Sequence, residues 1–358
     1  MQHFKHHQID KKKWDKCISS SKENIIYAFS WYLDCVSPNW EGFILEDNEQ
    51  NYEAVMPLPV KKKYGISFLQ QPLFVQQLGV FSTKKLSTSE FKTFLILLQK
   101  KFKLVSNYPF NTTNCEEFST EFEEVFHHKV DSNLKNFKNH HLSVQQNYLK
   151  IRQNYKRDTK YRINQAQKQN FKIIKKTKVD DIDLVWQFFE ESVFLENGIS
   201  NQAKPVLKKL FHILKEKELA ELVYIQNNEK KIVSGVLLVK SKSLYQENSI
   251  TKWIYLFNAA KPTYKRDESR RWFLDKFIQE KSNQEECFLN GNNFDIQSED
   301  ITYETILDFE SAQEKEVARF YASFGSEEKT FFVVDYNELP FYIKLAQEII
   351  QFINRKIL

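Results

Sequence analysis

The chain has 358 residues, of which 41% are hydrophobic and 28% are charged. This balance is typical of a folded globular protein long enough for two cores, and it excludes an intrinsically disordered chain. The formal net charge of +5 permits an anionic partner but does not require one, and we expect no DNA partner. No apolar run reaches the roughly 18–20 residues of a membrane-spanning helix, so no membrane span is predicted.

The N-terminus and the cysteines predict a cytoplasmic protein. Residues 1–7 contain no apolar segment of the kind that a secretory signal requires. The cysteines lie far apart and form no C-x-x-C motif, which favours reduced thiols. The adjacent pairs His127-His128 and His140-His141 have no Cys or acidic partner at ligand spacing, so no metal site is predicted.

The first part of the chain predicts a helix, a hairpin, a strand and a second helix. Trp14 belongs to the first helix. Two apolar runs flank the polar residues 47–51, which predicts a hairpin with its turn there. Val75–Ser82 follows as an extended strand, and Ser89 is the predicted N-cap of a helix that runs to Phe102.

The middle of the chain predicts a strand near Gln146–Lys150 and then a long polar helix from Arg152 to about Gln169. Asn170 suits the residue after that helix, because Asn tolerates the left-handed conformation. The later predicted elements are a strand at Phe171–Lys175, helices at Ile182–Phe194 and Lys204–Lys217, a hairpin at Leu222–Val239, a strand at Trp253–Ala260, a helix capped by Asp267, a strand at Thr305–Phe309, a helix at Glu314–Ser323 closed by Gly325, a strand at Thr330–Val334 and a C-terminal amphipathic helix.

Matching features recur in the same order in the two parts of the chain. Trp14 and Trp186 lie in similar helices, and a polar turn within a hairpin follows each. One constant offset aligns Val75–Ser82 with Trp253–Ala260 without a gap. So long an interval is no solenoid period and indicates two copies of one unit. We therefore predict an α/β (α+β) protein with domains at 1–150 and 151–358, each a mixed, mostly antiparallel sheet flanked by helices, and a bridging helix at 151–170.

Two motifs carry a resemblance to a known family. Residues 160–170 (KYRINQAQKQN) are similar to a basic helix of the form R-x-x-I-x-K-A-x-K-x-G. Residues 307–311 (LDFES) and 320–325 (FYASFG) are similar to an acidic strand end followed by F-K-x-x-F-G. Both motifs occur in this order in the FemAB-type aminoacyltransferases. The order of elements in the second copy also resembles that of the Gcn5-related N-acetyltransferase (GNAT) fold.

The resemblance implies two tandem GNAT-like domains that transfer an acyl or aminoacyl group from an activated donor to an acceptor amine in the cleft between them. The implied donor is a substrate, acyl-CoA or aminoacyl-tRNA, and no tightly bound cofactor is expected. The implied acceptor is a small or nucleotide-linked molecule, such as a cell-wall precursor. Tyr321 stands where the family often has a lysine and supplies no cation, which argues against aminoacyl-tRNA as the donor.

A GNAT domain binds the pyrophosphate of acetyl-CoA with a glycine-rich loop before a helix. The corresponding loops here, residues 82–88 and 261–267, contain no glycine. Pro262 removes an N–H donor, and Asp267 would repel a phosphate. Lys265, Arg266 and Arg270 are candidates to bind phosphate with side chains instead.

The polar helix supplies further candidate anion ligands, Lys156, Arg157 and Arg162. In one continuous helix, Arg152, Lys156 and Lys160 share a face, which suits a clamp for phosphates. The alternative interpretation is a solvated, charged helix face.

Asp308, Glu310 and Tyr321 are the candidate catalytic residues. Asp308 and Glu310 lie two apart near a strand end, so we expect them on one face, where they could orient or deprotonate an acceptor amine. Tyr321 could donate a hydrogen bond to the donor carbonyl. The alternative interpretation is a cap, a surface acid and a packed aromatic ring.

The sequence therefore predicts an acyltransferase, with two alternatives left open. One is a degenerate pair of domains that binds a ligand without chemistry. The other is an ordinary acyl-CoA-dependent N-acyltransferase.

Overall fold

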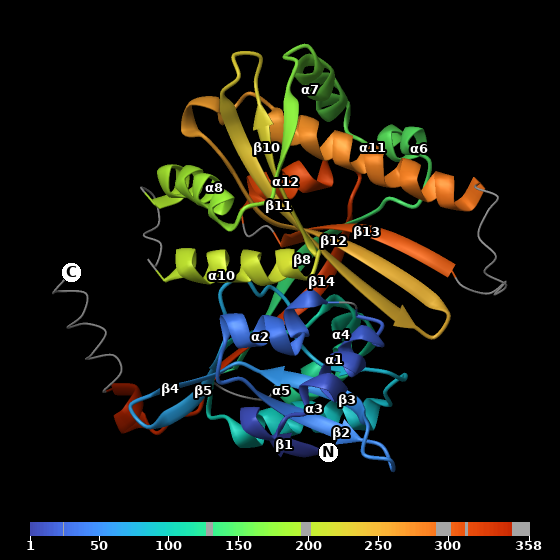
Figure 1. Ribbon diagram of the computed structural model, residues 1–358. Helices are drawn as coiled ribbons and strands as arrows, with labels where there is room; N and C mark the ends of the chain where they lie inside the picture. Colours follow the sequence, from blue (N-terminus) through green and yellow to red (C-terminus); the bar gives the residue numbers. More distant parts are fainter. Residues whose placement is uncertain (24, 127–131, 195–201, 291–301, 312–313, 346–358) are drawn as a thin grey trace.

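The computed structural model describes residues 1–23, 25–126, 132–194, 202–290, 302–311 and 314–345 (Figure 1). Its first half comprises β1 (Gln2–Phe4), α1 (Lys11–Ser19), α2 (Ser30–Val36), β2 (Glu41–Glu46), β3 (Tyr52–Leu58), β4 (Val60–Lys63), β5 (Ile66–Gln70), β6 (Phe81–Ser82), α3 (Thr88–Lys101), β7 (Leu104–Pro109), α4 (Thr112–Glu117), α5 (Ser119–Phe126) and β8 (Ser132–Ser143). Its second half comprises α6 (Tyr148–Gln153), α7 (Arg157–Gln167), β9 (Lys172–Lys176), α8 (Ile182–Phe189), α10 (Ala203–Glu216), β10 (Ala220–Gln226), β11 (Ile232–Tyr245), β12 (Asn248–Ala260), α11 (Ser269–Asn290), β13 (Thr302–Ser311), α12 (Lys315–Ala322) and β14 (Glu327–Asn337).

The predicted α/β class is confirmed: helices flank two mostly antiparallel sheets. The smaller sheet has the order β1-β2-β3-β6, and the larger sheet has the order β4-β5-β7-β14-β8-β13-β12-β11-β10-β9. In Figure 1 the first half forms the lower part of the molecule and the second half the upper part. The ten-stranded sheet therefore runs through both halves.

The hairpin turns of the two halves share one geometry. In β2–β3, Asp47 accepts the backbone N–H of Gln50 on its carbonyl and that of Asn51 on its side chain. In β10–β11, Asn227 accepts the N–H of Lys230 and of Lys231 in the same way. Gln50 and Lys230 both adopt left-handed backbone, with φ of 63° and 61°. An Asx side chain that closes a turn in the same way in both halves agrees with the predicted duplication.

The last strand of each half pairs within the sheet of the other half. β14, the final strand of the second half, lies between β7 and β8 of the first half, antiparallel to both. β8 in turn pairs with β13 of the second half. The two halves are thus joined through backbone hydrogen bonds. The predicted boundary at residue 150 stays a prediction.

Apolar side chains also join the halves along the boundary between them, which we call the seam. One continuous core contains Trp14, Tyr27 and Phe81 of the first half and Trp186 of the second half. The rings of Phe74 and Phe257 meet across the seam with centroids 6.3 Å apart. This part of the seam is packed, and the polar groups described below lie beside it.

The strand predicted at Val75–Ser82 is mostly irregular, and only Phe81–Ser82 joins a sheet as β6. Phe74 and Gly79 have positive φ values of 59° and 108°, which break the extended backbone. Side chains take over the hydrogen bonds of a ladder: Asn114 accepts the N–H of Val80 and donates to its carbonyl. The sequence pattern did not reveal that side-chain hydrogen bonds replace a strand ladder here.

The bridging segment is also different from its prediction. Residues 146–150 form no strand, and the single helix expected at 151–170 is two helices, α6 and α7, separated at residues 154–156. The break packs against Gly325: a Cβ there would lie 2.8 Å from Cβ of Asn154. Lys156 also donates its backbone N–H to the carbonyl of Ser323 (2.9 Å). Tertiary contact with the end of α12 therefore divides the helix.

Several local predictions are confirmed. Asn170 has the left-handed backbone expected of it, with φ of 52°, and Gly325 follows α12 with φ of 77°. Asp267 caps α11 by accepting the N–H of Ser269 (2.9 Å). Most of the predicted C-terminal helix lies outside the described residues. Within the described ranges, none of the helices combines the length and the hydrophobicity needed to cross a bilayer.

We predict that Gly325→Ala destabilises the protein more than Gly65→Ala. Both glycines have left-handed φ, 77° and 76°, but a Cβ at Gly65 meets open space, whereas one at Gly325 meets Asn154. The backbone strain alone costs about 1–2 kcal/mol at either position. The steric clash adds about 1–3 kcal/mol at Gly325 only. Urea denaturation of both variants measures the difference, and equal losses would contradict the docking of the α6–α7 break on Gly325.

Candidate active site at the seam

The candidate site lies where β12 and β13 diverge. Their parallel pairing runs from Asn248 opposite Thr302 to Ile254 opposite Asp308 and ends there, although both strands continue. Beyond that point β12 stays with β11, and β13 reaches β8 through an irregular register between Asp308 and Ser311. The backbone at this divergence leaves the regular hydrogen-bond ladder, and the side chains that it carries can face a reactant.

Asp308 is buried at this point and is held by a residue of β8, which comes from the first half. Its Oδ2 lies 3.2 Å from Nε2 of His141 on β8, and its Oδ1 accepts the backbone N–H of Glu310 (2.8 Å). Burial by itself raises the pKa of Asp308, but the interactions with His141, Lys252 and the Glu310 amide outweigh it and lower the pKa overall. Asp308 is thus a fixed negative charge.

Glu310 differs from Asp308 in its backbone conformation and in the direction of its pKa shift. Its backbone is left-handed, with φ of 64°, an uncommon and strained conformation for a non-glycine residue. Its carboxyl Oε1 accepts a hydrogen bond from the hydroxyl of Tyr27, which comes from the first half. Burial, together with the negative charge of Asp308, raises the pKa of Glu310 to about 8, and the Tyr27 hydrogen bond offsets this only in part. Such a carboxyl can exchange a proton near neutral pH.

Lys252 extends the polar cluster along the face that the second half turns toward the first. It is 7% exposed, and its Nζ donates to the backbone carbonyl of Glu23 (3.4 Å). Burial lowers the pKa of Lys252, while the charges of Asp308, Glu304 and Glu23 act to raise it. Lys252 therefore links Asp308 electrostatically to the segment of the first half that carries both Glu23 and Tyr27.

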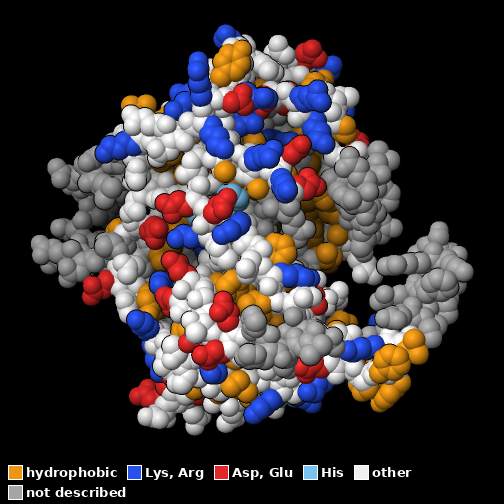
Figure 2. All heavy atoms as spheres, turned by 180° about the vertical axis from the view of Figure 1, so that it is seen from behind, with side chains coloured by type: hydrophobic (Ala, Val, Ile, Leu, Met, Phe, Trp, Pro, Cys, Tyr) orange, Lys and Arg blue, Asp and Glu red, His pale blue; other side chains and the backbone are white. Residues whose placement is uncertain are grey.

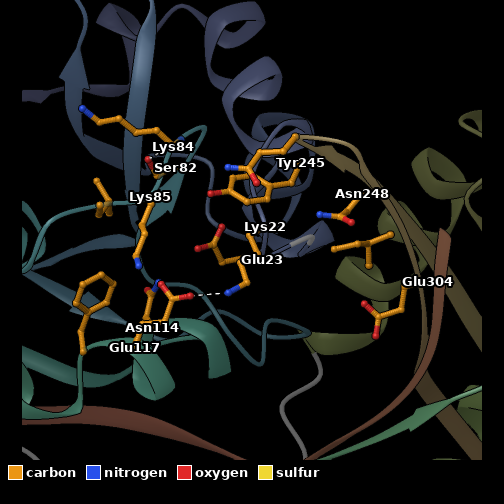
Figure 3. A pocket seen from close by; sticks show the side chains of 14 residues that line it. Lys22, Glu23, Ser82, Lys84, Lys85, Asn114, Glu117, Tyr245, Asn248 and Glu304 are labelled. Atoms are coloured by element: carbon orange, nitrogen blue, oxygen red, sulfur yellow. Dashed lines mark hydrogen bonds and ion pairs between the residues drawn. The ribbon is translucent and has the colours of Figure 1, made fainter. Parts of the chain in front are cut away.

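A cavity of about 530 Å³ opens at the seam beside this cluster (Figure 3). We call it the seam cavity, and its lining comes from both halves: Lys22, Glu23, Ser82, Lys84, Lys85, Leu86, Asn114, Glu117 and Phe118 from the first, and Tyr245, Gln246, Asn248, Ile250 and Glu304 from the second. Glu304 lies on the same strand as Asp308, an even number of residues away, so both face the first half. The predicted placement of a site between two copies agrees with this cavity.

Tyr321 packs on the opposite face of the sheet from Asp308. Its ring stacks on Phe309 with centroids 5.0 Å apart, and Phe309 alternates in direction with Asp308 along β13. The catalytic role predicted for Tyr321 stays a prediction. Beside it is Tyr255, whose ring centroid lies 6.4 Å from that of Tyr321. The buried hydroxyl of Tyr255 has no hydrogen-bond partner within the described part of the chain. An unpartnered buried hydroxyl is a candidate donor to a reactant.

The predicted anion ligands gather on the second half away from the seam, where Figure 2 shows many Lys and Arg side chains at the upper end. Arg162 is ion-paired with Asp158 (2.8 Å) and Glu268 (2.7 Å), so carboxylates already occupy its guanidinium. The break between α6 and α7 removes the continuous face expected for Arg152, Lys156 and Lys160. Lys156 and Arg157 are exposed at the start of α7.

The loop before α11 offers side chains but few backbone donors. The N–H groups of Tyr264, Lys265 and Asp267 all bond to carbonyls within the loop. Asp267 occupies the N-terminus of α11, as predicted. Lys265 and Arg266 are exposed, and Arg270 donates to the side chain of Asn258 (3.0 Å). This loop therefore does not form the backbone cradle that a GNAT domain uses for pyrophosphate.

The equivalent loop of the first half is closed in a similar way. The N-cap of α3 is Ser87, two residues before the predicted Ser89, and it forms a reciprocal capping box with Glu90. Lys84 forms ion pairs with Glu53 (2.8 Å) and Glu90 (3.4 Å). The chain's own groups thus occupy both helix N-termini.

Sequence reasoning identified Asp308 and Glu310 but missed the other four residues of the cluster. Lys252 left a weak signal, because it is a charge directly before the apolar run that starts at Trp253. Tyr27, Glu23 and His141 left none, since nothing in the sequence places them against β13. Among the described side chains, no three His, Cys, Asp or Glu residues form a potential metal site, and His127 and His128 lie outside the described residues.

No family model matches the chain, and no curated protein matches it. Among solved structures, the chain is similar to FemX, with a TM-score of 0.59, 9% sequence identity, and coverage of 93% of this chain and 97% of FemX. It is also similar to a conserved protein of unknown function from Bacteroides thetaiotaomicron, with a TM-score of 0.52, 8% identity, and coverage of 91% and 96%. Identities this low show the fold alone. The chain has the tandem GNAT fold of the FemAB-like proteins.

Proposed function

We propose that this protein transfers an acyl or aminoacyl group from an activated donor to an acceptor amine where β12 and β13 diverge. The observation that carries the proposal is Glu310. Its backbone is strained, its carboxyl lies at the seam with a pKa raised to about 8, and the chain has the tandem GNAT fold. An ammonium must lose a proton before its nitrogen can attack a carbonyl. Glu310 is suited to accept that proton.

The neighbouring residues divide the remaining tasks. Asp308, held ionised by His141 and Lys252, keeps the pKa of Glu310 high through its charge and fixes its backbone through the amide hydrogen bond. Tyr27 orients the Glu310 carboxyl from the first half. Both are positioning residues, and positioning is the main contribution that an enzyme makes to attack on an activated carbonyl.

The hydroxyl of Tyr255, which has no partner among the described residues, is our candidate donor to the carbonyl oxygen, together with Tyr321. Both tyrosines lie on the opposite face of the sheet from Asp308, so we place the carbonyl in the gap where the pairing of β12 and β13 ends. Neutral hydroxyls stabilise a developing oxyanion by hydrogen bonding without a full positive charge. The charge of Arg270 acts on both hydroxyls and lowers their pKa values, against the larger effect of burial, which raises them. Arg270 thus contributes positive potential on this face.

The closed loops before α3 and α11 favour a donor other than acyl-CoA bound in the usual manner. We propose Lys156, Arg157, Lys265 and Arg266 as side-chain contacts for a phosphate-bearing donor or acceptor, since they remain exposed. Arg162 is a weaker candidate because of its two ion pairs. The same closed loops favour the alternative of a degenerate pair that binds without chemistry. The cytoplasmic location stays a prediction.

We predict that Glu310→Gln lowers transfer by at least about 100-fold, as expected for loss of a general base. Mass spectrometry of primary amines incubated with aminoacyl-tRNA and acyl-CoA panels tests this. Glu327→Gln, an exposed carboxylate on β14, is the matched control. A wild-type transfer rate that rises as pH increases toward about 8 supports the proposal. A transfer rate in Glu310→Gln equal to that of the wild type would exclude Glu310 as the base.

The raised pKa of Glu310 also predicts a pH-dependent stability. An unfolded chain ionises this carboxyl near the ordinary value of 4.5, whereas the folded protein does so near about 8. The folded state therefore binds more protons in that window, and the contribution of Glu310 to stability declines as pH rises through it. Glu310→Gln should lose less stability than wild type between pH 5 and about 8. Urea denaturation across this range checks the prediction, and parallel curves would contradict it.

Tyr255→Phe should raise the free energy of unfolding by about 1 kcal/mol, because it removes a buried hydroxyl with no partner among the described residues. The same change should lower transfer, because it removes a carbonyl donor. Tyr336→Phe is the matched control, since its buried hydroxyl donates to carbonyls of α3 and its loss should destabilise. A Tyr255→Phe variant with unchanged transfer would exclude this hydroxyl from the reaction.

A further inference from the structure

The seam cavity has the volume of a small-molecule site and a lining that carries charges of both signs. Its volume of about 530 Å³ falls within the range of about 300–1,000 Å³ typical of ligand pockets. The first half supplies one wall, and the ends of β11, β12 and β13 supply the other. It therefore exists only when the two halves are assembled.

Glu23 carries an unsatisfied group in this cavity. Its Oε2 is buried and has no hydrogen-bond partner among the residues that the structure describes, and an unpaired buried carboxylate oxygen is costly. The nearby lysines are engaged elsewhere: Lys22 with Glu117 at 2.5 Å, and Lys252 with the backbone carbonyl of Glu23. Figure 3 shows the Glu23 carboxyl directed into the space below the Tyr245 ring. The missing partner is a hydrogen-bond donor, best supplied by a cation.

Lys85 provides a positive charge on the first-half side of the same cavity. It is exposed, and no carboxylate of the described part of the chain lies within ion-pair distance of its Nζ. In Figure 3 its side chain extends toward Asn114 and Glu117, whereas its neighbour Lys84 points away from the cavity. Lys84 is committed to Glu53 and Glu90. Lys85 is thus available to an anionic group.

With Lys22 and Glu117 neutralising each other, the remaining charges are arranged along the cavity. Lys85 lies on one side, Glu23 lies near the middle, and Glu304 lies on the far side. This order suits a ligand with one negative and one positive end. The Asn114 side chain is held in place by its hydrogen bonds with Val80 and Asn111.

We infer that the seam cavity binds a small zwitterion, whose ammonium group pairs with Glu23 and whose carboxylate or phosphate group pairs with Lys85. A short peptide with free termini and a phosphoethanolamine headgroup share this chemistry. The inference concerns binding alone, so it stands or fails separately from transfer at Glu310.

The test is isothermal titration of the full chain with three probes: dialanine, its N-acetylated amide, and O-phosphoethanolamine. We expect a zwitterionic probe to bind and the N-acetylated amide, which has neither charge, to bind at least about tenfold more weakly. Tighter binding of dialanine would identify the anionic group as a carboxylate, and tighter binding of phosphoethanolamine would identify it as a phosphate. Binding of neither zwitterion, or equal binding of the neutral amide, would overturn the inference.

Matched variants locate the bound probe. Lys85→Met and Glu23→Gln should each weaken binding of the zwitterion at least about tenfold, whereas Lys62→Met, at an exposed lysine of β4 outside the lining, should leave the affinity unchanged. Equal losses in Lys85→Met and Lys62→Met would overturn the assignment to the cavity. Melting curves confirm folding of each variant, and Lys85, being exposed, provides the test if Glu23→Gln does not fold.

The pH dependence provides a second readout. Burial raises the pKa of Glu23 to about 7. Affinity for the ammonium end should therefore rise as pH increases through about 7, and this rise should vanish in Glu23→Gln. The charged or titratable groups that act on Glu23 from the surrounding elements are Cys17, Lys22, Glu117, Tyr245 and Lys252. A pH-independent affinity in the wild type would exclude Glu23 as the partner.

Discussion

The structure depends on the exchange of strands between the two halves. β14 satisfies the backbone groups of both β7 and β8, and β8 satisfies those of β13. Without the exchange, each half would expose an unpaired strand edge, which proteins avoid because it invites aggregation. The ladders also fix the two halves at one relative position. A seam set by backbone hydrogen bonds can hold side chains from both halves in reactive geometry.

The polar cluster at the seam uses this rigidity. Three of its contacts each join one group from the first half to one from the second: His141 to Asp308, Tyr27 to Glu310, and the carbonyl of Glu23 to Lys252. Buried charges are tolerated when they are paired and hydrogen-bonded, and here the pairs exist only in the assembled molecule. Asp308 and Glu310 lie two residues apart on β13, yet the pKa of Asp308 is lowered and that of Glu310 is raised. The opposite shifts follow from their different partners.

The two loops that bind pyrophosphate in GNAT domains have a different role here. The chain's own side chains cap the helix N-termini that follow these loops, through Asp267 in one copy and through Ser87 with Glu90 in the other. A cap satisfies only some of the amides at a helix N-terminus, but it places the chain's own groups where a phosphate would bind. The fold is thus retained while one of its common binding devices is closed, which directs attention to the seam cavity and to exposed basic side chains.

The sequence by itself determined the features that depend on neighbours in the chain. It predicted the α/β class, the repeated hairpin turns, the left-handed Asn170, the Asp267 cap and the Gly325 helix end, because turn and cap chemistry acts over a few residues. It also singled out Asp308 and Glu310. Only the tertiary structure decided that β14 lies between β7 and β8, that 75–82 is mostly irregular, and that the bridging helix breaks at residues 154–156, where it packs against Gly325. Those outcomes depend on contacts between residues far apart in the chain, which local patterns do not encode.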